Sequence, residues 1–342
     1  MNAESATRPL VVVESVRALR ATTNPYIVTL VEGLSETAIV RLFSWRVALF
    51  GRYDVLHIHW PERLYEREGR ARTIVHSLLA LLLVARLRVT RMAVVRTLHN
   101  LSPHEPPSRL SRLVARSLDV VTTEWITLNE SRSESAARPG VLIPHPHYRD
   151  WFGPLPTLEA IPGRLAFFGQ IRAYKNVDGL LSAFREVRSD EVSLVIRGAA
   201  SDARLAAELS ALARADTRVD LELGHVSDAD LAAHILESEL VVLPYRDMYN
   251  SGALLLALSL GRPVLVPDNE MTRRLAEEVG GSWVVRYSGD LDADALAVAI
   301  EPPAAARAAE PDLSAREWPR IIDLHLEVFR RAVARRRQRR AR

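Results

Sequence analysis

Short apolar segments alternate with helical stretches along the whole chain, and this alternation constrains the fold more than any other feature of the sequence. Strands of a parallel sheet that is covered on both faces are short and almost wholly apolar. We expect such strands at residues 10–13, 55–59, 92–98 and 119–123, and again at 164–169, 192–198, 219–223, 240–245, 263–267 and 282–285. Helices are expected between them, for example over 26–34, 72–87 and 109–117. The pattern predicts an α/β fold with doubly wound parallel sheets.

Prolines and glycines concentrate between residues 139 and 163, and this cluster predicts a linker between two domains. The 342 residues are enough for two ordinary domains. We therefore expect one domain over residues 1–150 and a second over 151–315. A Pro- and Ala-rich stretch then precedes a last amphipathic helix, expected over 316–333, and an arginine-rich tail over 334–342.

Charge is distributed unevenly along the chain. Residues 1–150 carry 20 arginines and 14 acidic residues, residues 151–329 carry 17 basic and 28 acidic residues, and residues 330–342 carry eight arginines and no acid. The acidic second half argues against nucleic acid as a specific partner. Lys175 is the only lysine among the 45 basic residues, so its position calls for a local explanation.

Several classes of protein are excluded by what the sequence lacks. There is no cysteine, which excludes disulfides, thiolate metal sites, iron–sulfur clusters and thiol nucleophiles. No apolar run reaches the ~18–20 residues of a transmembrane helix. The polar residues 1–7 show no signal peptide, and we therefore expect a cytoplasmic protein.

The first candidate binding loop follows the strand expected at 164–169 and reads GQIRAYKNVDG from Gly169. A helix is expected to begin near Asp178. Backbone N–H groups at such a turn, with Arg172 and a Lys175 ammonium on a mobile stem, would bind a diphosphate. An ordinary surface loop with two cations is the alternative, but the absence of any other lysine favours a binding function.

The second candidate loop reads LPYRDMYNSGAL from Leu243 and contains Tyr245, Asn250, Ser251 and Gly252. Asn250 or Ser251 is the expected N-cap of the next helix. The small Gly252 lets a ligand approach the bare N–H groups at the positive end of that helix. A plain helix cap would also explain the Ser-Gly pair. Its position after another parallel strand nevertheless favours the second half of a nucleotide-diphosphate site.

Together these motifs resemble the glycosyltransferases related to family 4. The matching segments are GQIRAYKNV at 169–177, SG at 251–252, GRPV at 261–264, HIHW at 57–60, TLHN at 97–100 with PHE at 103–105, and IPH at 143–145. The resemblance covers almost the whole chain and implies the GT-B fold, two Rossmann-like domains facing across a cleft. It implies that the second domain binds a nucleotide-sugar donor and the first domain an acceptor. Arg172 and Lys175 match the basic pair that binds the donor diphosphate.

The chain also departs from that family. The usual pair of glutamates is absent, since Met248 and Leu256 stand where it would fall and only Asp247 could replace the first acid. This resembles an exopolysaccharide or capsule-type subgroup with Ser-Gly in place of the acidic motif. His99 matches a histidine that hydrogen-bonds the donor sugar near the reacting centre in related enzymes.

Histidines and one acid are the candidate catalytic residues. His57 and His59 face the same side of their strand, and at least one is expected to be a hydrogen-bonded core or cleft residue. His99 follows a strand at its carboxyl end, where doubly wound folds bind ligands. Glu105, beside His104 in a proline-rich loop, is the candidate base for an acceptor hydroxyl if the reaction inverts. A solvent-exposed pair is the alternative for those two.

No metal site and no cofactor are predicted. Asp290 and Asp292 have the Asp-x-Asp spacing of metal-dependent glycosyltransferases, but acids at the start of a helix explain them adequately. Eight consecutive apolar residues, 78–85, lie between arginines, which suits either a buried helix or an anionic membrane surface.

We therefore expect a metal-independent glycosyltransferase that moves a hexose from a nucleotide-diphosphate sugar to a glycan or lipid-linked glycan in cell-surface polysaccharide synthesis. A lipid-linked acceptor would suit a peripheral location on the inner face of the plasma membrane. The alternatives are a nucleotide-sugar 2-epimerase of the same fold and a non-catalytic glycan-binding or scaffold relative.

Overall fold

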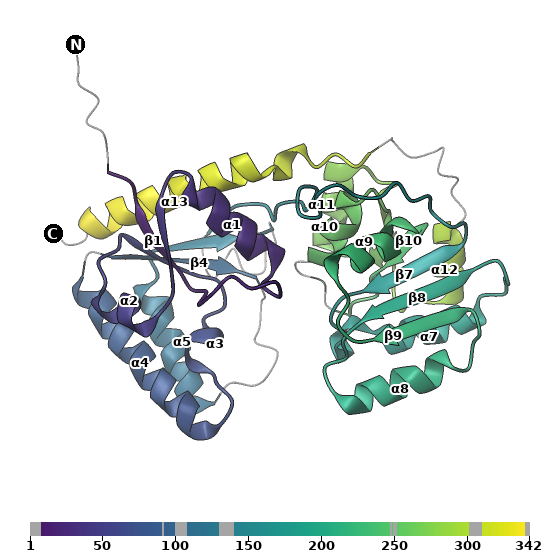
Figure 1. Ribbon diagram of the computed structural model, residues 1–342, viewed down its shortest axis with the longest axis horizontal. Coiled ribbons are helices and arrows are strands. Elements are labelled where there is room, and N and C mark those ends of the chain that lie inside the picture. The colour runs from purple at the N-terminus through teal and green to yellow at the C-terminus, as the bar shows by residue number, and fades with distance from the viewer. Residues whose placement is uncertain are drawn as a thin grey trace, which may run out of the picture. The chain divides into compact units, whose positions relative to one another are not determined.

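The computed structural model describes residues 8–90, 92–99, 108–129, 140–246, 248, 252–300 and 310–338. The chain divides into two compact units (Figure 1). Unit 1 comprises Met1–Pro146 with Arg316–Arg342, and unit 2 comprises His147–Ala315. Each unit contains one six-stranded sheet. Every pairing of neighbouring strands in the two sheets is parallel, which confirms the predicted α/β class with two doubly wound sheets.

The sheet of unit 1 has the strand order β2-β1-β3-β4-β5-β6. Its strands are β1 (Val11–Glu14), β2 (Ile39–Leu42), β3 (Val55–Ile58), β4 (Ala93–Leu98), β5 (Glu124–Thr127) and β6 (Val141–Leu142). The order reverses at β1, which lies between β2 and β3. The carboxyl ends of β1 and β3 therefore mark the point at which a doubly wound sheet binds its ligands.

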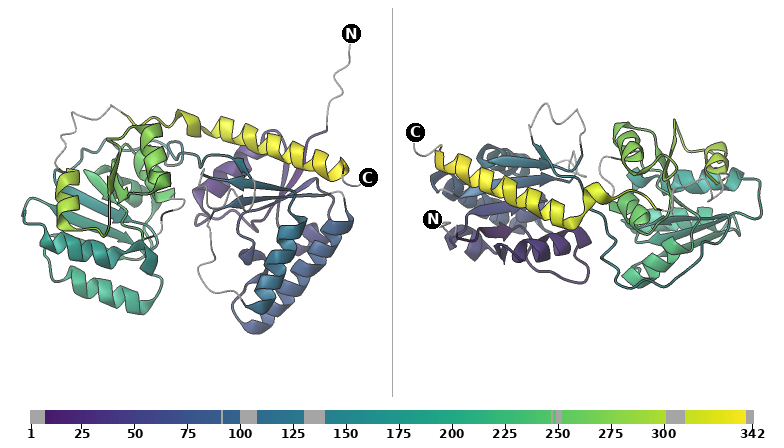
Figure 2. Two further views of the ribbon diagram at one scale, coloured as in Figure 1. Left: turned by 180° about the vertical axis from the view of Figure 1, so that it is seen from behind. Right: turned by 90° about the horizontal axis from the view of Figure 1, so that it is seen from above.

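Helices cover both faces of this sheet (Figures 1 and 2). They are α1 (Pro25–Ser35) and α13 (Trp318–Gln338) on one face, and α2 (Trp45–Phe50), α3 (Glu62–Tyr65), α4 (Arg70–Val89) and α5 (Arg109–Val121) on the other. Successive strand residues point to opposite faces. Val12 accordingly joins the core under α1 and α13, whereas Val13 joins the core under α4 and α5.

The start of α1 is determined by its capping residues. The side-chain oxygen of Asn24 accepts a hydrogen bond from the backbone N–H of Tyr26 at 2.9 Å. Pro25 occupies the first helical position, where the missing N–H has no consequence. The ring of Tyr26 then lies beside His59 and His99, which directly follow β3 and β4.

The sheet of unit 2 has the order β12-β11-β10-β7-β8-β9. Its strands are β7 (Arg164–Phe168), β8 (Ser193–Gly198), β9 (Val219–Leu223), β10 (Leu240–Val242), β11 (Val264–Pro267) and β12 (Val284–Tyr287). The helices are α7 (Val177–Glu186), α8 (Ala203–Ala213), α9 (Asp228–Leu236), α10 (Gly252–Ser259), α11 (Glu270–Val279) and α12 (Ala293–Ile300). Here the order reverses between β7 and β10, the two strands that precede the predicted binding loops.

One predicted strand is wrong. Residues 119–123 do not form a strand, because α5 continues to Val121 and β5 begins only at Glu124. Val114, Leu118 and Val121 are buried at helical spacing, so this valine-rich run completes the apolar face of the helix. The edge strands β2 and β6 were not predicted. The residues of β2 alternate between exposed and partly buried and include Arg41, and β6 has only two residues.

Other boundaries shift by a few residues. Along the chain, unit 1 ends at Pro146 and unit 2 begins at His147, whereas the sequence predicted the boundary at residue 150. The closing helix α13 packs within unit 1 and runs to Gln338, so it includes the first part of the stretch 334–342 that the sequence assigned to a tail. Among the described helices, none combines the length and hydropathy that a membrane crossing requires.

Candidate functional site

The carboxyl ends of β1 and β3 bring together a buried carboxylate and two histidines. His57 Nδ1 lies 2.9 Å from Glu14 Oε1, and His59 Nε2 lies 3.0 Å from Glu14 Oε2. Glu14 and His57 are wholly buried, and His59 is 2% exposed. The expectation that at least one of the two histidines is hydrogen-bonded in the interior is therefore confirmed for both.

Two residues at the end of β4 continue this network. Thr97 Oγ1 lies 2.8 Å from His57 Nε2, and His99 Nε2 lies 2.9 Å from His59 Nδ1. His99 follows directly after β4 and is partly exposed. The network therefore runs outward from Glu14 through His59 to His99, along the edge of the sheet where ligands of such folds bind.

Burial and hydrogen bonding determine the charges in the network. Burial raises the pKa of Glu14, but the attraction and hydrogen bonds of His57 and His59 outweigh it and hold that pKa well below its usual range. Burial lowers the pKa of His59 to about 4. Burial and the neighbouring histidines hold the pKa of His99 well below its usual value. At neutral pH the Glu14 carboxylate is ionised, and the imidazoles of His59 and His99 are uncharged.

Aromatic rings hold His99 in place. The Trp60 ring stacks on it with centroids 4.3 Å apart and an interplanar angle of 22°. The Tyr26 ring meets it edge-on at 5.2 Å and 85°. Tyr26 also contacts His145 at 5.1 Å, and its hydroxyl lies 3.4 Å from Nε2 of His325 on α13. Elements from both ends of the chain therefore fix the orientation of the His99 ring.

Glu14, His57 and His59 also have the residue types of a metal site, since one ligand atom of each lies within 4.8 Å of the others. Those ligand atoms already form the two short carboxylate–imidazole hydrogen bonds. A cation would have to replace both bonds in a space that is closed to solvent. The hydrogen-bonded network accounts for the arrangement, and we assign no metal to it.

In unit 2, Lys175 ends the short turn Ala173–Lys175 that follows β7. Its side chain is only 9% exposed, so the mobile ammonium expected from the sequence is wrong. Nζ lies 4.9 Å from the centre of the Tyr245 ring and 5.9 Å from that of Phe167. Within the described ranges no carboxylate is paired with this ammonium. Burial, with the nearby Arg172, lowers the pKa of Lys175 to about 8.

Glycines give the turn after β7 its open backbone. Gly169 has a φ of +97°, which disfavours any other residue, and a Cβ there would lie 3.7 Å from Lys175 Nζ. Gly198, at the end of β8, approaches so closely that a Cβ would come 1.9 Å from the Gly169 carbonyl oxygen. The ends of β7 and β8 can therefore meet only as bare backbone.

The loop after β10 is tied to the loop after β7. The backbone N–H of Arg246 donates to the Tyr174 carbonyl at 2.9 Å, and its guanidinium donates to Asn176 Oδ1 at 2.9 Å. Arg172 is partly exposed and, in the part of the chain that the structure describes, forms no ion pair with a carboxylate. Arg172 and Lys175 are thus two cations at this edge of the sheet without an acidic partner in the described ranges.

Not every predicted site residue can be located. Gly252 is the first residue of α10, which follows β10. Four residues considered in the sequence analysis lie outside the described residues: Glu105, Asn250, Ser251 and Asp247, the last of which could replace the first glutamate of the related family. Met248 is buried in the core of unit 2 and Leu256 packs against that core, so both positions at which the related family has glutamates are apolar.

Asp292 acts as a helix cap. Its Oδ1 accepts a hydrogen bond from the Ala295 N–H at 2.8 Å at the start of α12. This agrees with the explanation of the Asp290 and Asp292 pair as helix-start acids.

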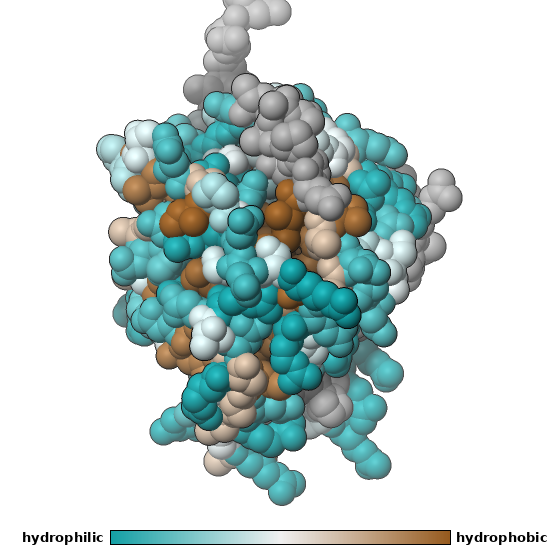
Figure 3. All heavy atoms as spheres, turned by 90° about the vertical axis from the view of Figure 1, so that its right-hand side faces the viewer, coloured by the Kyte–Doolittle hydropathy of each residue, from teal (hydrophilic) through white to brown (hydrophobic). Residues whose placement is uncertain are grey.

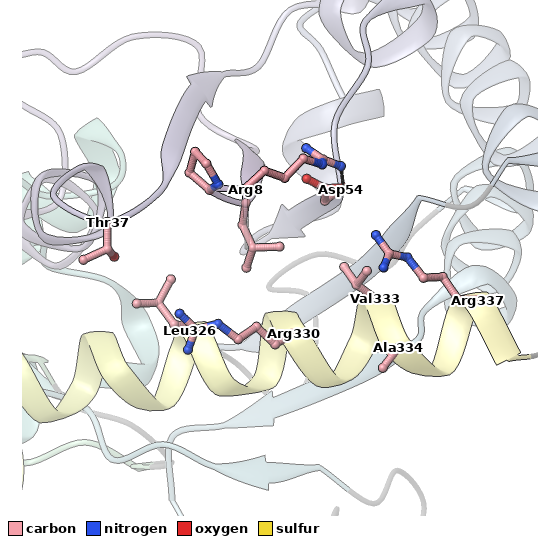
Figure 4. Close-up of a pocket in the computed structure, with 10 residues that line it drawn as sticks. Arg8, Thr37, Asp54, Leu326, Arg330, Val333, Ala334 and Arg337 are labelled. Atoms are coloured by element: carbon pink, nitrogen blue, oxygen red, sulfur yellow. Dashed lines mark hydrogen bonds and ion pairs between the residues drawn. The ribbon is translucent and has the colours of Figure 1, made fainter. Parts of the chain in front are cut away.

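A cavity of about 440 Å³ opens at the opposite, amino-terminal edge of the unit 1 sheet (Figure 4). Its lining includes Arg8, Asp54, Arg330 and Arg337. Arg8 and Asp54 form an ion pair there at 2.5 Å. Because doubly wound sheets bind ligands at the carboxyl ends of their strands, we do not include this cavity in the candidate site.

Two doubly wound units, each with candidate ligand-binding side chains at its switch point, agree with the GT-B class of proteins. Residues 162–302 match the family described as "Glycosyl transferases group 1". The chain is 42% identical to GDP-mannose:glycolipid 4-beta-D-mannosyltransferase of Xanthomonas campestris pv. campestris over 316 residues, which cover 92% of this chain and 90% of that protein. The chain belongs to the group 1 glycosyl transferases.

Solved structures share the fold over nearly the whole chain. Sucrose-phosphate synthase from Thermosynechococcus elongatus superposes with a TM-score of 0.67 at 15% identity, covering 96% of this chain and 100% of that one. HepE of Anabaena in complex with UDP and glucose gives 0.61 at 13% identity, with 96% and 98% covered. A UDP-N-acetylglucosamine 2-epimerase of Listeria monocytogenes, described as putative, gives 0.59 at 13% identity, with 94% and 95% covered. Likenesses this remote in sequence show the fold alone.

The predicted GT-B fold and the predicted hexosyltransferase class are thereby confirmed. The relative with extensive sequence identity is a transferase, and the epimerase is similar only in fold.

Sequence reasoning missed Glu14 in the network and Tyr26, whose ring packs against His99. Glu14 ends an apolar run, and a charge at the end of a buried strand was the signal that could have identified it. Tyr26 carried no signal, because its neighbours come from segments far away in the sequence.

Proposed function

We propose that this protein transfers mannose from GDP-mannose to a glycolipid acceptor and forms a β-linkage. The donor, acceptor and linkage are those in the name of the relative that is 42% identical over 92% of this chain. GDP-mannose carries its sugar in the α-configuration, so a β-product requires inversion at the anomeric carbon. Such a displacement needs a base for the acceptor hydroxyl and stabilisation of the departing diphosphate.

The observation that carries this proposal is the buried ammonium of Lys175, which has no carboxylate partner among the described residues. Removing a cation from water without a counter-ion is unfavourable. Lys175 lies at the carboxyl edge of the sheet, where ligands of such folds bind. We infer that an anionic ligand supplies the negative charge that its ammonium requires. Lys175 and Arg172 bind the donor diphosphate in this proposal, and they neutralise the charge that develops on it as the glycosidic bond breaks.

The surrounding loops complete the donor site. Gly169 has no side chain between its backbone and the Lys175 ammonium, and the Tyr245 ring packs against that ammonium. Asn250 and Ser251 precede Gly252 in the sequence and are the remaining candidate donor residues. Gly252 begins α10, and in this proposal the positive end of that helix contributes to binding the diphosphate. These fixed groups suffice for leaving-group stabilisation, and the proposed reaction needs no divalent metal.

Unit 1 binds the acceptor in this proposal. Its switch point carries His99, which is held by Trp60 and Tyr26 and is partly exposed. His99 and Glu105 are the candidate catalytic groups. The apolar side chains of Met248 and Leu256 leave the carboxylates of the related family without a counterpart at those positions.

The exposed side of α4 supplies a docking surface for an anionic membrane, where a glycolipid acceptor resides. Leu78 is 54% exposed, Leu82 is 59% exposed, and Val75 and Val89 extend the same stripe. Neither α4 nor its neighbour α5 has an acid apart from Asp119, which is paired with Arg96. Their exposed arginines are Arg70, Arg72, Arg88, Arg109, Arg112 and Arg116.

An apolar stripe bordered by arginines fits a surface of anionic lipids. By contrast, the face of the molecule in Figure 3 is mostly hydrophilic, and its apolar residues form small, separate groups. We place the protein on the cytoplasmic face of the membrane, held by the stripe on α4 and by the arginines around it.

The test is transfer of radiolabelled mannose from GDP-mannose to a glycolipid in detergent, with the linkage of the product read by NMR. Wild-type protein should form a β-mannoside, and Lys175→Met should lose transfer and GDP binding. Arg204→Met, which removes an exposed cation on α8, is the matched control and should retain both. An α-linked product, or undiminished transfer by Lys175→Met, would overturn the proposal.

A further inference from the structure

We propose that the cavity at the amino-terminal edge of the unit 1 sheet binds the phosphate headgroup of an anionic lipid. The cavity has a volume of about 440 Å³ and lies where β1, β2 and β3 begin, beside residues 326–337 of α13 (Figure 4). The proposed donor and acceptor sites both lie at the carboxyl ends of strands. The cavity is therefore a separate binding site that the transfer reaction does not use.

Three arginines line the cavity from two sides. Arg8 belongs to the segment that leads into β1, whereas Arg330 and Arg337 lie two turns apart on α13. Figure 4 shows their side chains on the side of α13 that faces Arg8. A guanidinium presents a planar fork of N–H donors that matches the oxygens of a phosphate. Arginines from opposite walls can therefore bind one phosphate group together.

The described lining of the cavity has an excess of positive charge. Its one carboxylate is that of Asp54, which pairs with Arg8 at 2.5 Å and accepts a hydrogen bond from the Val11 N–H at 3.0 Å. In the described parts of the chain, neither Arg330 nor Arg337 forms an ion pair with a carboxylate. An anionic ligand would supply the charge that complements these two guanidinium groups.

Aliphatic side chains form much of the remaining wall. Leu10, Leu326 and Val333 line the cavity, and all three belong to or pack against the core under α13. As far as the structure describes the lining, it contains no aromatic ring on which the base of a nucleotide could stack. Guanidinium groups beside aliphatic side chains suit a phosphate that is joined to an apolar stem, as it is in a lipid.

The carboxyl end of α4 lies at the same edge of the sheet. The guanidinium of Arg336 on α13 donates to the carbonyl of Arg88 at 3.2 Å and also to that of Leu87. Val89 follows directly, is 66% exposed, and ends the apolar stripe of α4. The surface that we propose for membrane docking therefore extends to the edge that holds the cavity. The choice of a lipid rests on that proposed docking, whereas the positive charge of the cavity does not depend on it.

The test is calorimetry with two soluble probes, dihexanoyl phosphatidic acid below its micelle concentration and inorganic phosphate. Wild type should bind the short-chain lipid more tightly than phosphate, because only the lipid buries an apolar stem. Arg330→Gln combined with Arg337→Gln should weaken lipid binding by roughly tenfold or more, since charge-assisted hydrogen bonds are lost. Arg46→Gln combined with Arg320→Gln is the matched control. It removes two exposed arginines of unit 1 that do not line the cavity, and it should bind the lipid as wild type does.

Ala334→Trp separates a cavity from a surface that is merely basic. Ala334 lines the cavity and is exposed, so a larger side chain there fills the space and leaves every arginine in place. This variant should keep the Tm of wild type and lose the lipid, whereas a diffuse basic surface would retain it.

No lipid binding by wild type, wild-type affinity in Ala334→Trp, or equal losses in the two double variants would overturn the inference. Inorganic phosphate bound as tightly as the lipid would overturn the lipid as the ligand. These measurements involve neither GDP-mannose nor a membrane, so their failure is distinct from failure of the proposed transfer or of docking through α4.

Discussion

The ammonium of Lys175 lies 4.9 Å from the centre of the Tyr245 ring, although the two residues follow different strands of the unit 2 sheet. The face of an aromatic ring attracts a cation, but more weakly than a carboxylate does. The Tyr245 ring therefore holds the ammonium in position, and the ammonium can still bind an anion such as a diphosphate. The neighbouring strands β7 and β10 bring the pair together at the switch point.

Lys175→Met is expected to raise the stability of the ligand-free protein while abolishing GDP binding. Burial lowers the pKa of Lys175 from 10.5 to about 8. At neutral pH the burial of the charged ammonium therefore reduces the free energy of unfolding. A shift of this size corresponds to about 3 kcal/mol at most. Thermal unfolding should show a higher Tm for Lys175→Met at pH 7. Between pH 8 and 10.5 the side chain of Lys175 is protonated in the unfolded wild type but not in the folded one. The stability of the wild type therefore rises across this pH range, and the difference in Tm between Lys175→Met and wild type shrinks by pH 10. A lower Tm for the variant at pH 7 would show that the ammonium already has a favourable partner.

The affinity for GDP is expected to fall as the pH rises above about 8. Below this pKa Lys175 is charged and ready to bind the diphosphate, whereas above it binding must first take up a proton. The loss should approach tenfold per pH unit. Lys175→Arg keeps its charge throughout and shares any titration of the nucleotide itself, so it is the reference for calorimetry between pH 7 and 9.5. Parallel curves for the two proteins would contradict a role for Lys175 in binding the anion.

The alternation of apolar and helical segments was sufficient to predict both sheets and most of their strands. It did not predict the edge strands β2 and β6, because exposed residues interrupt the apolar run of β2 and β6 has only two residues. The hydrogen bond between Glu14 and His57 could not be predicted from the sequence either, because it depends on the order of the strands in the sheet. The two residues pair across β1 and β3, and no local pattern indicates which strands are neighbours.

For the candidate site, a single unusual residue carried the information. Lys175 identified the loop because every other basic residue is arginine. The burial of its side chain could not be foreseen, since it depends on Tyr245 and on the path of the chain after β10. Composition thus located the cation, and only tertiary packing showed that it lacks an acidic partner among the described residues.

Membrane binding is expected to depend on the exposed stripe of α4. Leu78→Glu combined with Leu82→Glu places two acids in the stripe and should reduce flotation with anionic liposomes at least tenfold, because both apolar burial and attraction to the lipid are lost. Val298→Glu is the matched control, since Val298 is 64% exposed but lies on α12 of the acidic unit 2. Flotation of wild type should fall in high salt. Equal flotation of the double variant and the control would exclude α4 from this role.

Transfer is expected to persist in excess EDTA. The diphosphate that leaves must have its charge neutralised, and Lys175, Arg172 and the start of α10 provide fixed positive groups for this at one edge of a sheet. Asp292 has a different task, because its carboxylate caps α12 through the Ala295 N–H. Asp292→Ala should therefore lower stability by about 1 kcal/mol, as loss of a helix cap does, and leave kcat within twofold of wild type. Asp292→Asn, which retains a capping oxygen, should recover the stability. Loss of transfer in EDTA, restored by manganese or magnesium, would mean that a cation carries the charge we assign to Lys175 and Arg172.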